Sequence, residues 1–338
     1  MSDKLELKSI DVEGSDQVGK GDAVKNIAQE YCDRGIDTTI ISFPYYATPI
    51  GYCIREVLTE GFASDVDINE EREVDVKMAL FALNRLEILN SILSATREGI
   101  YIFDRGPFSN ALTIAYFLVN EVPNTRDVEE LVDIAMDLDE YFRNILNIDN
   151  CVIRLQTEEG IWVQNRGEKG DLHENSDVQE KSKEVYARFE SKVGSGWTNI
   201  TTKKAEGFRE REDIKNDCVD FASARLGIYG RRSRAKRVPK YIGVESIQDD
   251  LYIGSEIDKE VRKDWLNAIR SNDKTEIYSL GKLIAKHIAE TADTVQWYNE
   301  GIRNEIRRII ELNPEILSVL EYMYGEKFVI NFLQSIHE

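Results

Sequence analysis

The residues from Glu13 to Asp22 read E-G-S-D-Q-V-G-K-G-D and combine two kinds of group that bind phosphate. Gly14 and Gly19 permit a tight bend that brings successive backbone N–H groups onto phosphate oxygens. Lys20 adds a mobile ammonium group at the start of a predicted helix, whose dipole also favours an anion. A plain glycine-rich turn is the alternative. The residues expected to contact the phosphates of a ligand are Ser15, Asp16, Gln17, Val18, Gly19, Lys20, Gly21 and Asp22.

A phosphate-binding loop needs a strand before it and a helix after it, and the flanking residues have these patterns. Residues Leu5–Val12 alternate as a strand, although Asp11 interrupts them, and Lys20–Asp33 are helical in pattern. Further strands are predicted at Thr38–Phe43, Ile100–Asp104, Cys151–Leu155 and Trp197–Thr201. Helices are predicted between the strands at Glu70–Arg97, Ser109–Asn120, Val128–Asn147, Val178–Lys192 and Arg211–Leu226. This alternation predicts a three-layer α/β/α fold, with helices on both faces of a five-stranded parallel sheet.

The composition favours an acidic, cytoplasmic protein with a large core. The chain has 338 residues, of which 42% are hydrophobic, and this length is consistent with more than one domain. The net charge of −19 makes nucleic acid an unfavourable partner. No secretory signal or membrane span is expected, because the first residues are charged and no long apolar run follows. The widely spaced cysteines, which indicate reduced thiols, are Cys32, Cys53, Cys151 and Cys218.

Residues 229–240 read Y-G-R-R-S-R-A-K-R-V-P-K and form the strongly basic run of this acidic chain. They fit a solvated linker or, alternatively, a docking strip for acidic surfaces or nucleotide phosphates. After this run the pattern becomes helical, with Ile277, Leu280, Ile284 and Ile288 on one apolar stripe. We therefore expect a first domain over residues 1–228, a basic linker over 229–243 and an all-helical domain over 244–338 that serves packing or oligomerisation.

Four stretches of the first half of the chain occur in a recognisable order and spacing: V-E-G-S-D-Q-V-G-K-G, I-S-F-P-Y-Y-A-T-P-I-G, L-F-A-L-N-R-L-E and F-D-R-G-P-F-S-N-A. Together they resemble the thymidylate kinase family of nucleoside monophosphate kinases. Weaker resemblances follow in N-R-G-E-K-G-D-L-H-E, similar to the lid of the family, and in E-V-Y-A-R-F and G-W-T-N-I-T. The resemblance covers about residues 8–227. It implies a P-loop kinase fold, ATP as phosphoryl donor, Mg²⁺ and a homodimer.

The residues expected to act on the transferring phosphoryl group come from three places in the chain. Asp104 and Arg105 follow an apolar strand, so they lie at the carboxyl edge of a parallel sheet, where ligands bind. The resemblance implies that Asp104 holds Mg²⁺ through water and that Arg105 bridges the donor and acceptor phosphates; a strand-end ion pair is the alternative. Arg166 adjoins a glycine- and charge-rich segment that suits a mobile lid, although a solvated arginine fits equally. The predicted catalytic residues are Lys20, Asp104, Arg105 and Arg166.

A second group of residues is placed to bind the base of an acceptor nucleotide. Phe81 and Arg85 are four residues apart and share one helix face, where a ring and a guanidinium can hold a pyrimidine. A snorkelled surface contact is the usual alternative for such a pair. The resemblance identifies them with a base-stacking Phe and a base-reading Arg, and it places Ser109 and Asn110 near the base.

The remaining acceptor contacts rest more on the resemblance than on the residues themselves. Phe43 and Pro44 end a strand and would line the acceptor pocket, although Phe43 suits a core position equally well. Asp16 would meet the sugar hydroxyl of the acceptor, whereas an ordinary turn residue is the alternative. Arg105 would contact the acceptor phosphate as well as the donor.

Several residues depart from the family pattern. Gly21 lacks the hydroxyl that would ligate Mg²⁺, and Asp22 adds a negative charge beside the phosphates unless it turns away or shares the metal. Thr113 is another departure from the family pattern, and it leaves open whether the acceptor site selects against ribose. Because the pattern loses cationic groups, a slower or altered reaction is expected. The other departures are Tyr46, Gly106, Trp162 and Leu172.

Three functional hypotheses follow. The first is a nucleoside monophosphate kinase that transfers the γ-phosphoryl group of ATP to dTMP or a related pyrimidine deoxynucleotide. The second is a catalytically degenerate kinase that serves as a nucleotide-binding or assembly module. The third is a kinase of the same fold that acts on a modified deoxynucleotide or a nucleic-acid end, which the basic run weakly favours and the overall acidity opposes.

Overall fold

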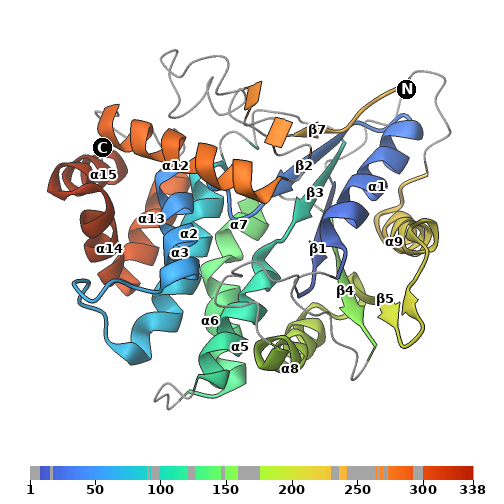
Figure 1. Ribbon diagram of the computed structural model, residues 1–338, viewed down its shortest axis with the longest axis horizontal. Helices are drawn as coiled ribbons and strands as arrows, with labels where there is room; N and C mark the ends of the chain where they lie inside the picture. Colours follow the sequence, from blue (N-terminus) through green and yellow to red (C-terminus); the bar gives the residue numbers. More distant parts are fainter. Residues whose placement is uncertain are drawn as a thin grey trace.

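A central parallel sheet forms the middle layer of the protein (Figure 1). The computed structural model describes residues 8–15, 18–89, 92, 99–120, 126–145, 149–158, 176–229, 236–241, 263–264, 267–268, 271, 273–291 and 300–337. The five long strands are parallel and confirm the predicted sheet. In the order β5-β4-β1-β3-β2 they are Trp197–Lys204, Asp149–Thr157, Lys8–Glu13, Ile100–Asp104 and Thr38–Ser42.

Two short strands extend the sheet at its edges. The hairpin strand β6 (Gly207–Phe208) is antiparallel to β5, and β7 (Lys240–Tyr241) is parallel to β2. The segment before β7 is also attached to the domain, because Arg237 pairs with Asp37 at 2.9 Å and its carbonyl oxygen accepts from Gln29. The described part of the basic run therefore lies along the β2 edge, while residues 230–235 lie outside the described residues.

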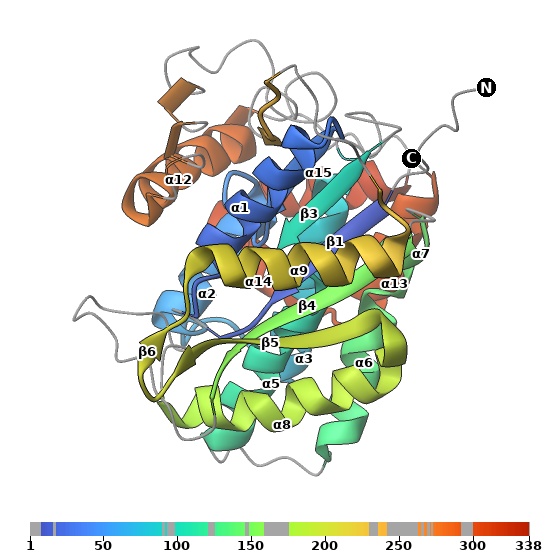
Figure 2. The ribbon, with the colours of Figure 1, turned by 90° about the vertical axis from the view of Figure 1, so that its right-hand side faces the viewer.

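Helices cover both faces of the sheet and confirm the three-layer expectation. Alternate residues of β3 point to opposite sides, so that Ile102 joins one core cluster and Phe103 the other. The first cluster packs under α1 (Lys20–Asp33) and α9 (Arg211–Leu226), and Figure 2 shows α9 crossing in front of the sheet. The second cluster packs against α3 (Glu73–Glu87), α5 (Asn110–Val119) and α8 (Ser176–Val193).

Three helical boundaries differ from the sequence predictions. Helix α2 (Pro49–Glu60) was not predicted, although Pro49 in its first turn and the Thr48 side chain that accepts from Gly51 N–H are standard signals for a helix start. The helix predicted from residue 70 begins as a 3-10 turn over Glu70–Arg72, and α3 then ends at residue 87. The helix predicted over 128–147 divides into α6 (Val128–Leu138) and α7 (Glu140–Ile145) around Asp139.

The C-terminal region, drawn in orange and red in Figure 1, is helical, as predicted. It lies beside α2 and α3. Its helices are α12 (Lys274–Thr291), α13 (Glu300–Leu312), α14 (Glu315–Tyr324) and α15 (Glu326–His337). Apolar residues such as Ile284 and Ile306 belong to the same core cluster as Ile50 of α2 and Leu83 of α3. This cluster therefore continues from the sheet into the C-terminal helices. None of the described helices is long and apolar enough to cross a membrane.

Candidate active site

The loop between β1 and α1 bends at two glycines with left-handed backbone conformations, with φ of 136° at Gly14 and 91° at Gly19. A Cβ atom at Gly14 would lie 2.2 Å from the carbonyl oxygen of Leu155, so no side chain fits there. The buried Lys20 side chain folds back over the loop, and its Nζ donates to the carbonyl oxygens of Gly14 at 2.7 Å and Ser15 at 2.5 Å. The ammonium group therefore lies beside the backbone that would cradle a phosphate.

The other predicted loop residues have different environments. Val18 is buried in the core beneath α1, so only its backbone is available to a phosphate. The Asp22 carboxylate is exposed and pairs with Arg211 at the start of α9, at 3.0 Å. The charge that the sequence placed beside the phosphates is thus directed toward α9. Asp16 and Gln17 lie outside the described residues.

Two carboxyl groups, Asp11 and Glu13, are buried in β1 beneath the sheet edge. Glu13 Oε1 accepts from Gly106 N–H at 2.8 Å and its Oε2 from Ser109 Oγ at 2.6 Å, while Asp11 accepts from Asn150 at 3.0 Å. A Cβ atom at Gly106 would lie 2.9 Å from Asp11 Cγ and 3.2 Å from Glu13 Oε1. The departure at Gly106 is therefore explained by these carboxyl groups, which leave no room for a side chain.

Burial raises the pKa of Glu13 to about 8 and the pKa of Asp11 to about 6, because a carboxylate without water around it is destabilised. For Glu13, the hydrogen bonds from Ser109 and Gly106 oppose this rise only in part. At neutral pH the folded protein therefore holds a proton on Glu13 that the unfolded chain releases.

This proton predicts that the folded state becomes less stable as the pH rises. Since the folded pKa of Glu13 lies above the unfolded value of 4.5, its contribution is complete below 4.5 and is lost as the pH rises through 8. We expect Glu13→Gln, whose amide can satisfy both partners, to reduce the loss of unfolding free energy between about pH 6 and pH 8.5 by about 2 kcal/mol. Urea unfolding at the two pH values measures this. An unchanged pH dependence in the variant would contradict the assignment.

Asp104 and Arg105 lie at the carboxyl end of β3, next to the loop. The register pairs Asp104 with Val12, and the Arg105 N–H donates to the Val12 carbonyl oxygen at 3.2 Å. Arg105 has a φ of 69° and is the one non-glycine residue with a positive φ among those described. Such a conformation costs about 1–3 kcal/mol and must be held by its surroundings.

The Asp104 carboxylate fits the role of a water-mediated magnesium ligand. It is half-buried and accepts a long hydrogen bond, of 3.5 Å, from Ser42 Oγ. The carboxylate therefore retains capacity to accept hydrogen bonds from water. No group of three or more metal-ligating side chains occurs among the described residues. Mg²⁺ is commonly held by one or two carboxylates together with substrate phosphates, and Asp104 could supply one such carboxylate.

The predicted base-reading residue, Arg85, is buried and forms a bidentate ion pair with Asp139. Its Nε and Nη2 donate to the two Asp139 oxygens at 2.6 Å each, and both side chains are at most 2% exposed. Asn110 Nδ2 also points to Asp139, at 3.4 Å. Sequence analysis missed Asp139, whose surrounding D-L-D-E stretch has the pattern of a solvated acidic helix end. A base that uses Arg85 would have to displace Asp139 or bind beside it.

An aromatic cluster lies next to this pair. The ring of Phe43 packs 5.9 Å from Phe103 of β3 and 5.9 Å from Phe142 of α7, and all three rings are buried. Phe43 therefore occupies a core position, the alternative that the sequence left open. Phe81 and Pro44 are half-buried. Two of the predicted acceptor residues, Arg85 and Phe43, thus contact Asp139, which separates α6 from α7, and Phe142 of α7.

The segment after β2 is held by a hydrogen-bond network that sequence analysis did not identify. Asn84 Oδ1 accepts from Tyr45 N–H at 2.7 Å, and Glu87 accepts from Thr48 Oγ1 at 2.6 Å and from Ile50 N–H at 3.1 Å. Burial raises the pKa of Glu87 to about 7. The i, i+3 spacing of Asn84 and Glu87, which places both side chains on one face of α3, was the available signal. The network fixes the backbone that leads into α2.

The remaining departures are placed as follows. Thr113 is buried within α5. The ring of Tyr46 packs edge-on against the ring of Tyr278 of α12, with 5.2 Å between their centroids, so the C-terminal region contacts this position. A Cβ atom at Gly281 would lie 2.9 Å from the Tyr46 carbonyl oxygen, which shows how closely α12 approaches. The lid positions Arg166, Trp162 and Leu172 lie outside the described residues.

A glycine loop that joins a parallel strand to a helix, with a lysine bonded over it and Asp-Arg at the neighbouring strand end, defines a P-loop nucleotide-binding domain. The family model of thymidylate kinase matches residues 12–204, more than half of the chain, and the chain belongs to this family. No match was found among curated proteins. The matched segment ends with β5, so the C-terminal helices lie outside it.

Proposed function

We propose that this chain transfers the γ-phosphoryl group of ATP to dTMP or a related pyrimidine deoxynucleotide. The proposal is carried by the position of Lys20, at the start of α1, and of Asp104 and Arg105, at the end of β3, along one edge of the sheet within the segment that matches the family. Phosphoryl transfer needs positioning and compensation of negative charge, without a covalent intermediate. Backbone N–H groups, one lysine and one arginine at a single edge supply both.

In this mechanism the loop and Lys20 bind the β- and γ-phosphates of the donor. Arg105 lies between the donor and acceptor phosphates and reduces their repulsion as charge moves during transfer. Asp104 would hold Mg²⁺ through water, and the ion would neutralise phosphate oxygens when bound. Arg166 would approach the transferring group from the lid.

Acceptor binding in this proposal requires an exchange of partners at Arg85. The guanidinium is satisfied by Asp139, between α6 and α7, and Phe142 of α7 packs on Phe43, so residues of this part of the chain occupy the surroundings of both predicted acceptor residues. A pyrimidine carbonyl would take over a donor of Arg85 as Asp139 moves aside, or would bind beside the pair, with Ser109 and Asn110 close by. The acceptor's sugar would contact Asp16.

A coupled assay of ADP release across nucleoside monophosphates tests the proposal. Turnover with dTMP that exceeds turnover with purine monophosphates is the expected result, and ribose and deoxyribose forms of each pyrimidine test the selectivity that Thr113 leaves open. A modified deoxynucleotide as the preferred acceptor would replace dTMP in the proposal. Absence of turnover with every acceptor would overturn the enzymatic function.

The Arg85–Asp139 pair also favours a second candidate, a nucleotide-binding or assembly module without turnover. A protein that no longer binds a base could keep the base-reading arginine in a buried ion pair, as Arg85 is here. Calorimetry distinguishes the two candidates: the module binds ATP and shows no heat with any monophosphate, whereas the kinase binds both.

We further propose a homodimer in the cytoplasm, with nucleic acid as an unfavourable partner of this acidic chain. The division into residues 1–228, 229–243 and 244–338 likewise stays a proposal. Size-exclusion chromatography with light scattering tests the dimer.

A further inference from the structure

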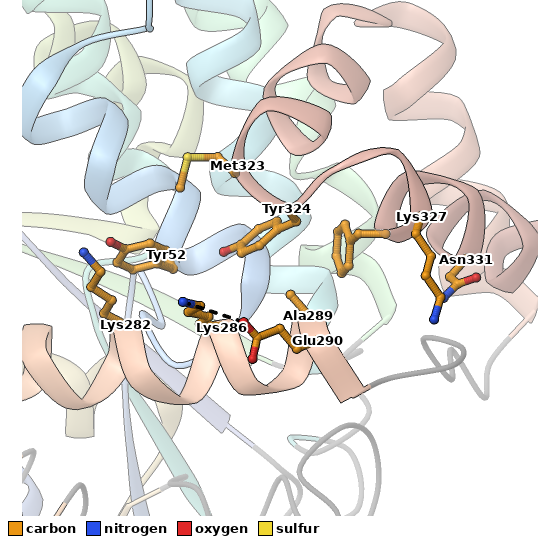
Figure 3. A pocket seen from close by; sticks show the side chains of 10 residues that line it. Tyr52, Lys282, Lys286, Ala289, Glu290, Met323, Tyr324, Lys327 and Asn331 are labelled. Atoms are coloured by element: carbon orange, nitrogen blue, oxygen red, sulfur yellow. Dashed lines mark ion pairs between the residues drawn. The ribbon is translucent and has the colours of Figure 1, made fainter.

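The C-terminal helices line a cavity of about 480 Å³, which lies apart from the residues of the proposed phosphoryl transfer. Its walls come from α2, α12, the end of α14 and α15 (Figure 3). All the lining residues except Tyr52 lie beyond residue 204, where the match to the family model ends. The cavity is therefore a feature of this chain's own C-terminal region.

Aromatic side chains form one wall of the cavity, and their contacts fix their positions. Tyr52 of α2 is 6% exposed, and the rings of Tyr324 and Phe328 lie 4.9 Å apart at an angle of 52°. The Tyr324 hydroxyl donates to the Pro49 carbonyl oxygen at 2.8 Å, which fixes its orientation. Rings that are fixed in this way offer faces and edges against which a flat ligand can pack at little entropic cost.

Three lysines line the cavity. Lys282 and Lys286 project from α12, and Lys327 projects from α15 on the other side of Tyr324, as Figure 3 shows. The carboxylate that lines the cavity is Glu290, which pairs with Lys286 at 3.7 Å through two largely exposed side chains, an interaction of little strength. Three ammonium groups against one carboxylate leave two positive charges in a chain whose net charge is −19.

We propose that this cavity binds a small aromatic phosphate ester of the nucleotide class, with its ring against Tyr52, Tyr324 and Phe328, its phosphates on Lys282 and Lys286, and Lys327 at the other end of the ligand. Lysine ammonium groups bind phosphate as point charges, and the volume is within the range of cavities that enclose a ligand of that size. An acidic peptide would match the charge, but the aromatic side chains suit a flat ring and the volume of the cavity suits a small molecule.

The test is an acetylation footprint of the full chain, in which mass spectrometry follows the reaction of each lysine. At about ten times the dissociation constant of ATP, acetylation of Lys282, Lys286 and Lys327 is expected to slow about tenfold. Adenosine tests the ring alone, and tripolyphosphate tests the phosphates alone. Lys181 of α8, whose side chain is 35% exposed and does not line the cavity, is the internal control and keeps its rate.

The double substitution Lys282→Glu, Lys286→Glu supplies the matched variant, because both side chains are exposed and the fold does not depend on them. Protection of Lys327 by ATP is expected to disappear in it, whereas any protection of Lys20 in the loop remains. Lys20 and Lys327 thus report the two sites separately, so that failure of one proposal does not obscure the other. The proposal is overturned by a lack of protection, by equal protection with tripolyphosphate, or by protection with polyglutamate alone.

Discussion

Replacing Asp139 by alanine is expected to lower the free energy of unfolding by about 3–5 kcal/mol. The Arg85 guanidinium would then stay charged inside the protein, with two of its donors lacking the carboxylate oxygens that now lie at 2.6 Å. Asp139 itself is 0% exposed, so water cannot replace it without rearrangement of the core. Urea unfolding followed by circular dichroism, at a pH near neutrality, measures the change.

The control for this prediction is a variant in which both partners become apolar, Arg85→Met with Asp139→Leu. Because it buries no charge, it should lose much less stability than the single replacement. A single variant within about 0.5 kcal/mol of the parent chain would show that the pair is open to solvent, against the geometry described above. The single variant also frees Arg85, so a gain in pyrimidine binding would indicate that Asp139 competes with the base.

Replacing Lys20 by alanine is expected to reduce turnover by roughly 10²–10³-fold or more, since one preorganised charge at the transferring group is removed. In the structure the Lys20 ammonium group bonds to the carbonyl oxygens of Gly14 and Ser15, and a phosphate would exchange with these partners. The coupled ADP-release assay with dTMP as acceptor measures the effect.

Lys25→Ala, in the same helix and with the same loss of charge, is the matched control and should keep its turnover. Equal turnover in Lys20→Ala and the parent chain would remove the loop from the proposed chemistry. If the parent chain shows no turnover, loss of ATP binding in Lys20→Ala would still support the nucleotide-binding module.

The sequence was sufficient for the sheet because each strand carries its own local signal. The stretches that end at Val12 and Asp104 predicted two strands of one parallel sheet, and the parallel pairing of β1 with β3 confirms this, whereas the order of the strands was not predicted. Asp11 looked wrong for a buried strand, yet the strand is formed because Asn150 satisfies one of the carboxyl oxygens. Local pattern also sufficed for the C-terminal helices, where stripes such as Ile302 and Ile306 are buried.

What the sequence could not predict depends on contacts between distant residues. Arg85 and Asp139 are 54 positions apart, and neither one indicates the other. Gly106 departs from the family pattern, and the reason for this departure is Asp11, which lies 95 positions earlier in the chain. Such reasons appear only when the strands are placed side by side. The placement of Asp16 and Arg166 stays a prediction.

The hydrophobic cluster that passes from the sheet into the C-terminal helices has a practical consequence for anyone who shortens this protein. A fragment that stops after α9 would leave Ile50, Cys53 and Leu83 without part of the apolar surroundings they share with Ile284 and Ile306. Newly wetted aliphatic surface of this kind promotes self-association. Expression of the family-matched segment alone is therefore a poor starting point for assays, and the intact chain is the appropriate material.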